Sequence, residues 1–408
     1  MMLAISSEIK TQANKNLAKR IDSIDILRAI TMVLMIFVND FWTLSNIPDW
    51  LKHAPRGEDG IGFSDVIFPA FLFIVGLSLP YAIEKRRIKG ESSPQILKHV
   101  LFRTFALLTM GVFLVNGESI HPDASGIKAG TWFPMVCLCF LLIWNNYSEK
   151  ISFVLRSILQ YAAIFILILL AFIYRGGENG NIRFETHWWG ILGLIGWAYL
   201  ASALITVFAK NNGYILLVGW IFFCTLSILN KANLIPNSIF LDYLPGTIKG
   251  GTLVALTMGG VLSSFIFRHY VQKSANLKLS LVFILSSIVL VALSLITRPY
   301  WGLSKLGATP AWLFLCSALT LILFTLTYWI VDVWKKSKSF NFIKSAGTDT
   351  LLCYLIPYFF YGIYELTDFH LPELITTGWL GLIKSLLFAL LCVFITKKLN
   401  NSGVRLKI

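Results

Sequence analysis

Charged residues are scarce in this sequence. They make up 14% of its 408 residues, whereas hydrophobic residues make up 56%. Soluble domains contain about 25% charged and about 45–50% apolar residues, so this composition excludes a single water-soluble core. Runs of about 18 or more apolar residues recur along the chain, and a helix of that length crosses a bilayer. The sequence therefore predicts an all-α fold, a polytopic bundle of transmembrane helices.

The first 20 residues lack the apolar stretch and the small-residue cleavage site of a secretory signal. The first hydrophobic segment is therefore expected to remain as a helix of the mature protein. Residues 1–20 are predicted to form an amino-terminal tail, and residues 21–408 one transmembrane domain without a soluble linker.

The sequence also lacks the cysteine spacing of a zinc site or a disulfide framework. All six cysteines lie inside apolar runs, and Cys137 and Cys139 are separated by one residue only. No metal site is predicted. The net charge of +14 comes from Lys and Arg residues in the segments between apolar runs. This placement indicates membrane topology, so the lipid bilayer is the expected partner and nucleic acid is not.

Apolar segments predict about twelve membrane helices, with eleven as the alternative because the fourth range is short. The ranges are 24–44, 63–83, 98–116, 131–146, 151–174, 188–208, 213–231, 247–267, 279–297, 310–333, 343–363 and 376–396.

The distribution of positive charge predicts the orientation. If the amino terminus is inside, 24 of the 35 Lys and Arg residues lie in inner segments and 9 in outer segments. This bias follows the positive-inside rule, so both termini are expected in the cytoplasm. The loop that contains His53 then faces outward.

Ionisable residues near the ends of the first predicted helix need a reason, because such groups are rare in a bilayer. Asp25 and Arg28 are three residues apart at its inner end and share a face. Their spacing favours an ion pair that anchors the helix over a phosphate contact by Arg28. Asn39 and Asp40 lie at its outer end.

The next outer segment contains His53 and, at the start of the second predicted helix, Asp65. Taken alone, Asp65 is best interpreted as an acidic residue that favours the positive end of a helix, and His53 as a solvated loop residue. A later outer segment, "TRPYWGLSKLGATPAW", combines Arg298 and Lys305 with aromatic residues such as Trp301. Aromatic faces with nearby polar groups suit a sugar, although Trp and Tyr also mark membrane interfaces.

Three stretches resemble the transmembrane acyltransferases related to heparan-α-glucosaminide N-acetyltransferase, especially their bacterial relatives. They are "RIDSIDILRAITMVLMIFVND", "KHAPRGEDGIGFSDVIFPAFLFIVGLSL" and "RTFALLTMGVFLVN". The sequence departs from the animal enzyme in a longer spacing between Asn39 and His53 and in having no large luminal amino-terminal domain. It also has Gly193 and Leu194 where a glutamine–arginine motif is expected.

The resemblance implies that His53 is the catalytic histidine, that Asn39 lies beside it, and that Asp65 is the aspartate of the family's active site. It further implies transfer of an acetyl group from cytosolic acetyl-CoA to the amine of a terminal glucosamine of heparan sulfate, or to a sugar hydroxyl, across the membrane. Histidine suits the role of base because its ordinary pKa lies near neutral pH. Direct transfer and an acetyl-histidine intermediate both remain open.

Acetyl-CoA as the acyl donor requires cations for its phosphates, and Arg28, Arg103 and Arg86 are expected to supply them. Asp40, Arg298 and Trp301 are expected to contact the acceptor sugar. The transmembrane domain is then the acyltransferase domain.

A secondary transporter of a small polar solute is the alternative, and a membrane scaffold is the third. A transporter predicts broken helices at matching positions of two halves, whereas the unusual residues here concentrate in the first two ranges, which favours the enzyme. Short loops and the missing luminal domain suggest a bacterial inner membrane, with the active site facing the periplasm. Whether the protein is a monomer or a homodimer is left open.

Overall fold

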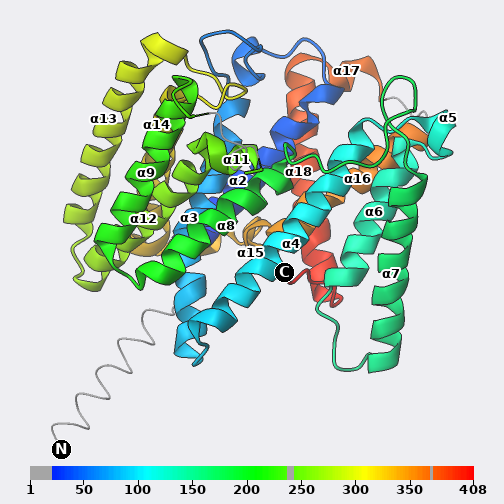
Figure 1. The fold of residues 1–408 in the computed structure, drawn as a ribbon, viewed down its shortest axis with the longest axis horizontal. Coiled ribbons are helices and arrows are strands. Elements are labelled where there is room, and N and C mark those ends of the chain that lie inside the picture. The colour runs from blue at the N-terminus through cyan, green and yellow to red at the C-terminus, as the bar shows by residue number, and fades with distance from the viewer. Residues whose placement is uncertain (1–20, 237–242, 368–370) are drawn as a thin grey trace, which may run out of the picture. The chain divides into compact units, whose positions relative to one another are not determined.

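The computed structural model describes residues 21–236, 243–367 and 371–408, and the regular structure of these residues consists of helices, with no β-strand among them. The predicted fold class is confirmed (Figure 1). The tail expected over residues 1–20 lies outside the described residues.

Each of the twelve predicted ranges contains a helix. Within the described ranges, nine helices are long and apolar enough to cross a membrane: α3 (Ser64–Ile88), α4 (Ser93–Glu118), α7 (Phe153–Ile173), α8 (Ile191–Ala209), α9 (Gly213–Lys231), α12 (Thr252–Gln272), α13 (Asn276–Trp301), α14 with its π-helical turn (Pro310–Val333) and α18 (Gly378–Asn401).

The other three predicted ranges correspond to shorter or more polar helices. They are α2 (Asp22–Asn39), α6 (Ala129–Trp144) and α16 (Thr350–Thr367). Helix α2 carries Asp22, Asp25 and Arg28 in its first two turns, α6 has 16 residues, and α16 contains four tyrosines. The charges of α2, the short length of α6 and the tyrosines of α16 explain why these three helices fall outside the group of nine.

Two predicted helices are interrupted. The range 247–267 divides into α11 (Gly246–Gly250) and α12 at Gly251, whose φ of +73° is one that L side chains rarely adopt. The range 343–363 divides into α15 (Lys344–Thr348) and α16 at Asp349. Hydropathy averaged over a membrane-length range does not reveal these breaks, because the five-residue helices α11 and α15 are too short to change the average.

The chain forms two compact units. The first contains residues 53–104 and 197–339 together with the chain up to residue 27, and the second contains residues 28–52, 105–196 and 340–408. In the first unit, α12 packs along α3 and against α9, and α13 packs along α14. In the second unit, α6 packs against α16 and α7, and α18 packs against α16. The second unit also contains the short helices α5 (Pro122–Ser125) and α17 (Glu373–Thr376).

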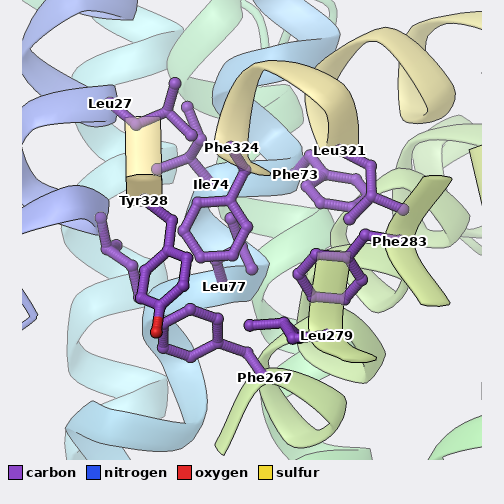
Figure 2. Close-up of a cluster of buried hydrophobic side chains, with 11 residues drawn as sticks. Leu27, Phe73, Ile74, Leu77, Phe267, Leu279, Phe283, Leu321, Phe324 and Tyr328 are labelled. Carbon is purple, nitrogen blue, oxygen red and sulfur yellow. The ribbon is translucent and has the colours of Figure 1, made fainter. Parts of the chain in front are cut away.

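Aromatic rings fill the core of the first unit (Figure 2). Phe267 of α12 lies 5.1 Å from the ring of Phe324 and 5.0 Å from the ring of Tyr328, both from α14 or its end. Phe283 of α13 adds a further ring 6.0 Å from Phe324. Leu27 of α2 and Leu77 of α3 close the cluster. Such contacts hold membrane helices together by packing, since lipid is as apolar as the side chains themselves.

Glycines let the backbones of α3 and α12 approach closely. A Cβ atom added to Gly76 would lie 1.9 Å from the carbonyl oxygen of Thr257, and one added to Gly260 would lie 1.9 Å from that of Phe73. Small residues at such positions are a common feature of membrane helix interfaces. Gly130 of α6 and Gly362 of α16 make a similar approach in the second unit.

Replacing Gly260 by alanine is expected to destabilise the protein by about 1–3 kcal/mol, the usual cost of overpacking. The Cβ atom meets backbone, which cannot rotate away. Because alanine is the better helix former by about 1 kcal/mol, propensity alone predicts the opposite sign. The apparent Tm of the purified protein in detergent measures the effect, with Gly246→Ala as the control, since nothing lies within 4 Å of its added Cβ. An unchanged or raised Tm for Gly260→Ala would contradict the close packing.

Candidate functional site

Asp65, in the first turn of α3, is the centre of the candidate site in the first unit. Its side chain is 2% exposed. Oδ1 lies 2.6 Å from Nδ1 of His53, and Oδ2 accepts hydrogen bonds from the backbone N–H groups of Ala54 at 2.9 Å and Gly62 at 3.0 Å. A buried carboxylate needs such donors, because transfer out of water is costly for an unpaired charge. Asp65 therefore fixes both the loop before α3 and the imidazole.

The tautomer of His53 follows from this contact. A carboxylate only accepts hydrogen bonds, so Nδ1 carries the proton that it donates to Asp65. Nε2 then carries the lone pair, and it has no hydrogen-bond partner among the residues that the structure describes. The side chain of His53 is 49% exposed, so a second molecule can reach Nε2. An imidazole held in this way can accept a proton at Nε2, which is the property that a general base requires.

Lys305, from the loop between α13 and α14, lies beside the pair. Its Nζ is 3.3 Å from Nδ1 of His53 and 3.8 Å from Oδ1 of Asp65. Since Nδ1 already donates to Asp65, the ammonium acts as a charge next to the carboxylate rather than as a donor to the ring. Burial lowers the pKa of Lys305, an effect that the charge of Asp65 partly opposes.

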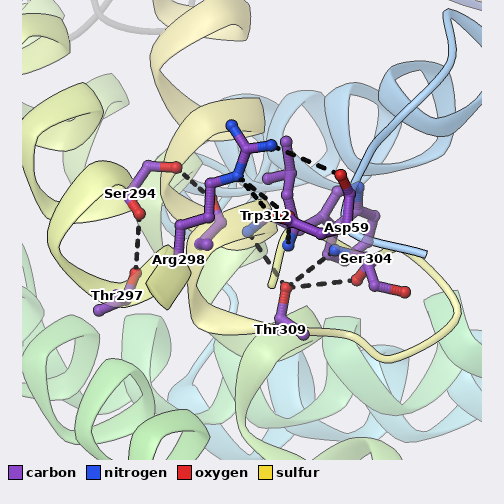
Figure 3. Close-up of polar contacts among 9 residues, drawn as sticks. Asp59, Ser294, Thr297, Arg298, Ser304, Thr309 and Trp312 are labelled. Atoms are coloured by element: carbon purple, nitrogen blue, oxygen red, sulfur yellow. Dashed lines mark hydrogen bonds and ion pairs between the residues drawn. The ribbon is translucent and has the colours of Figure 1, made fainter. Parts of the chain in front are cut away.

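A clamp formed by Asp59 and Arg298 fixes the loop of Lys305 against the loop of His53 (Figure 3). Nε of Arg298 lies 3.0 Å from both carboxylate oxygens of Asp59, and the N–H of Leu303 donates to Oδ1 at 2.7 Å. The N–H of Gly60 returns a bond to the carbonyl of Leu303 at 3.0 Å. Nη2 of Arg298 also donates to the carbonyl of Asp59 at 3.4 Å. Five hydrogen bonds thus join two segments that are more than 200 residues apart in the chain.

The start of α14 completes this unit's part of the site. Thr309 caps the helix, because its Oγ1 accepts from the N–H of Trp312, and it also accepts from the N–H of Ser304 (Figure 3). The indole N–H of the buried Trp312 donates to the carbonyl of Asp65 at 3.0 Å. This hydrogen bond fixes the first turn of α3, which carries the Asp65 carboxylate.

Asn39 and Asp40 belong to the second unit, where they have different surroundings. Asn39 ends α2, and its exposed side chain lines a cavity of about 690 Å³. Asp40 is buried and accepts hydrogen bonds from Nζ of Lys384 at 2.6 Å, Oγ of Ser385 at 2.6 Å and the hydroxyl of Tyr361 at 3.1 Å. These bonds tie the end of α2 to α18 and α16.

The three arginines predicted to hold phosphate differ in what they already contact. Arg86 makes an ion pair with Glu91 through Nη1, and Arg28 donates to the carbonyl of Gly347 at 2.9 Å. Arg103 lies over the ring of Tyr199 at 4.9 Å, and its buried Nε has no hydrogen-bond partner in the described part of the chain. Of the three, Arg103 keeps an unused donor.

The remaining predicted residues lie at the end of α13. Arg298 forms the clamp with Asp59, and Trp301 is the last residue of the helix, partly exposed, with its ring 5.5 Å from Tyr300. No pattern in the sequence pairs Lys305 with His53 or Lys384 with Asp40. The combination of cations and aromatic residues in "TRPYWGLSKLGATPAW" was the only signal that pointed to Lys305.

These features define a multi-pass helical membrane protein with a histidine–aspartate pair at the start of a membrane helix. Residues 20–179 match the family model described as heparan-alpha-glucosaminide N-acetyltransferase, catalytic. The matched range contains Arg28, Asn39, His53, Asp65 and Arg103. The resemblance predicted from the sequence is thus confirmed for this part of the chain.

Two curated relatives carry the name heparan-alpha-glucosaminide N-acetyltransferase. The mouse protein is 28% identical over 116 residues, which cover 28% of this chain and 16% of the relative. The human protein is 32% identical over 104 residues, covering 24% of this chain and 14% of the relative. The chain therefore aligns with about a sixth of the length of these relatives.

Loss of the clamp is expected to remove an acid-sensitive part of the stability. The Leu303 N–H and the Arg298 guanidinium hold the pKa of Asp59 below its ordinary value. A carboxyl whose pKa is lowered by folding stabilises the protein above its unfolded-state pKa and loses this effect as the pH falls through the folded-state pKa. The Tm difference between wild type and Asp59→Asn should thus be present at pH 7 and shrink toward pH 3.

The control for this comparison is Asp123→Asn, which changes an exposed aspartate on α5. Its Tm difference from wild type should stay near zero over the same pH range. A pH-independent difference for Asp59→Asn would argue against the charge of Asp59 as the source of the stability.

Proposed function

We propose that this protein is a transmembrane acyltransferase. It moves an acetyl group from cytosolic acetyl-CoA to an amine or hydroxyl of a sugar on the other side of the membrane, with a terminal glucosamine as the first acceptor to test. The observation that supports this most directly is the 2.6 Å contact between His53 and Asp65, which leaves Nε2 of His53 unbonded. The match of residues 20–179 to the catalytic region of an N-acetyltransferase supports the reaction class.

In the proposed reaction, the neutral amine attacks the thioester carbonyl. A nitrogen–carbon bond forms, the carbon–sulfur bond breaks, and the proton lost by nitrogen passes through Nε2 of His53 to the leaving thiolate. Asp65 holds the imidazole in the tautomer that accepts this proton and stabilises the imidazolium that forms. Asn39, which the resemblance implies lies beside the catalytic histidine, is proposed to donate a hydrogen bond to the carbonyl oxygen as it becomes negative.

The proposal assigns Arg28, Arg86 and Arg103 to the phosphates of the donor. Arg103 is the strongest candidate, because its Nε is buried without a partner among the described residues and a buried donor is costly to leave unbonded. Arg86 first has to exchange its contact with Glu91 for one with phosphate. Asp40, Arg298 and Trp301 are assigned to the acceptor sugar. Arg298 already forms an ion pair with Asp59, and Asp40 with Lys384, so these two residues have to contact the sugar in addition to their present partners.

The charge bias of the sequence supports cytoplasmic termini, a donor that enters from the cytoplasm and a His53 loop that faces the periplasm of a bacterial inner membrane. With that orientation, residues 21–408 form the acyltransferase domain.

Replacing His53 by alanine is expected to lower acetyl transfer by about a hundredfold to ten-thousandfold, the usual contribution of a positioned base. Purified protein is assayed with labelled acetyl-CoA and glucosamine. His187→Ala is the matched control, because His187 also lies in a predicted outer segment and makes only a 3.9 Å contact with Glu185. Wild-type turnover by a folded His53→Ala protein would exclude His53 from the reaction.

Lys305→Gln is expected to lower kcat for acetyl transfer severalfold. Nζ of Lys305 lies 3.8 Å from Oδ1 of Asp65, and two opposite unit charges at this distance attract by about 1 kcal/mol even in water. Lys305→Arg retains the charge and should retain the wild-type kcat. A wild-type kcat for a folded Lys305→Gln protein would exclude a role for the Lys305 charge in the reaction.

A further inference from the structure

The second unit contains a cavity beside Asn39 to which no ligand is assigned. All of its lining residues belong to the second unit, and its volume of about 690 Å³ is in the range of small-molecule sites. Aromatic side chains dominate the walls: Trp42, Phe133, Tyr354, Tyr358, Tyr361 and Tyr364.

The aromatic residues form continuous walls rather than isolated contacts. The ring of Trp42 lies 5.3 Å from that of Tyr361 and 6.3 Å from that of Tyr364, both edge to face. Phe133 lies 5.3 Å from Tyr358. Such faces suit the apolar side of a sugar ring, and they attract a cation that approaches within about 6 Å of a ring centre.

Among the residues that the structure describes, the charged side chains that line the cavity are acidic. They are Glu118, the last residue of α4, and Glu365, on α16, and no described lysine, arginine or histidine lines it. Both carboxylates are exposed, and neither has an ion pair or a hydrogen bond among the residues described here. Two unpaired carboxylates attract a cation and repel phosphate. The nucleotide end of acetyl-CoA is therefore a poor occupant, and an amine is a good one.

A pair of tyrosine hydroxyls adds polar groups to the cavity. Tyr354 and Tyr358 both line it, and their hydroxyl oxygens are 3.2 Å apart. One hydroxyl proton is used between them, so the other remains a donor and the outer lone pairs remain acceptors. Neither hydroxyl has a second partner in the described part of the chain. Together with the amide of Asn39, these groups can bond to ring hydroxyls.

We propose that this cavity binds the acceptor as a protonated amino sugar, with the ammonium group held by Glu118 and Glu365 and the ring held against the aromatic walls. One of the two carboxylates takes a proton from the ammonium group and so leaves the neutral amine that the proposed reaction requires. Asp40, Arg298 and Trp301 do not line this cavity, so it places the acceptor on other residues than those three. Naming the sugar as acceptor rests on the proposed function, whereas the preference for a primary ammonium rests on the cavity. The headgroup of an ethanolamine lipid presents the same ammonium without a ring, so the test includes it.

Binding is measured with the purified full chain in detergent, by titration with glucosamine, N-acetylglucosamine and phosphoethanolamine. Glucosamine should bind at least about tenfold more tightly than N-acetylglucosamine, since a hydrogen bond to a charged group contributes about 1.5–3 kcal/mol and about 1.4 kcal/mol corresponds to tenfold in Kd. Equal affinity for both sugars would overturn the proposal. Equal affinity for phosphoethanolamine and glucosamine would overturn its sugar part.

Glu118→Gln and Glu365→Gln should each raise the Kd for glucosamine about tenfold and leave the Kd for N-acetylglucosamine unchanged. Glu373→Gln, an exposed glutamate on α17 outside the cavity, is the matched control. Trp42→Leu tests the wall independently, because Trp42 is 62% exposed and its replacement leaves the core intact. It should raise the Kd severalfold. Unchanged glucosamine binding in all three cavity variants would overturn the proposal.

Acetyl transfer, measured on the same samples, separates this inference from the proposed function. Selective binding of glucosamine without transfer from acetyl-CoA would refute the acyltransferase and leave the cavity assignment standing. Transfer with the same KM for glucosamine in wild type and both glutamate variants would refute the cavity assignment and leave the acyltransferase standing.

Discussion

The candidate site depends on the need to satisfy one buried carboxylate at the start of a membrane helix. Asp65 is almost completely removed from water, so its carboxylate needs hydrogen-bond donors from the protein itself. The backbone donors of Ala54 and Gly62 fold the preceding loop back on the helix, and the imidazole of His53 supplies the third bond. The tautomer of His53, and hence its capacity to accept a proton at Nε2, is a consequence of satisfying Asp65 rather than a separate feature.

The second constraint is that Lys305, a loop residue, has to keep one position relative to Asp65 and His53. Lys305 lies in a connection between two helices, where backbone freedom is greatest, yet its ammonium has to stay close to Asp65. The clamp of Asp59 with Arg298 and Leu303 removes this freedom by joining the two loops with charged and backbone donors. Exposed ion pairs contribute little to stability by themselves, so positioning is the better explanation for this one.

Hydropathy predicted the helices, and the resemblance predicted that His53 and Asp65 belong to one site. The two residues are only twelve positions apart in the sequence, so the loop between them can bring their side chains together. The sequence did not predict the breaks at Gly251 and Asp349, because averaging over a membrane-length window hides the short polar helices α11 and α15. Nor did it predict Lys305 beside His53, since 252 residues separate them and only packing brings the loops together.

The Asp40 cluster and the Asp65–His53 pair differ in whether all of their polar atoms have hydrogen-bond partners. This difference indicates where chemistry occurs. The carboxylate of Asp40 is as buried as that of Asp65, but Lys384, Ser385 and Tyr361 occupy it fully, as a structural buried ion pair requires. The pair of Asp65 and His53 instead ends in an unbonded Nε2 that remains accessible. Ionisable groups at a membrane are rare and often mark functional sites, and an accessible, unbonded Nε2 can bond to a substrate. Incomplete bonding, rather than charge itself, therefore favours the His53 pair over Asp40 as the reacting group.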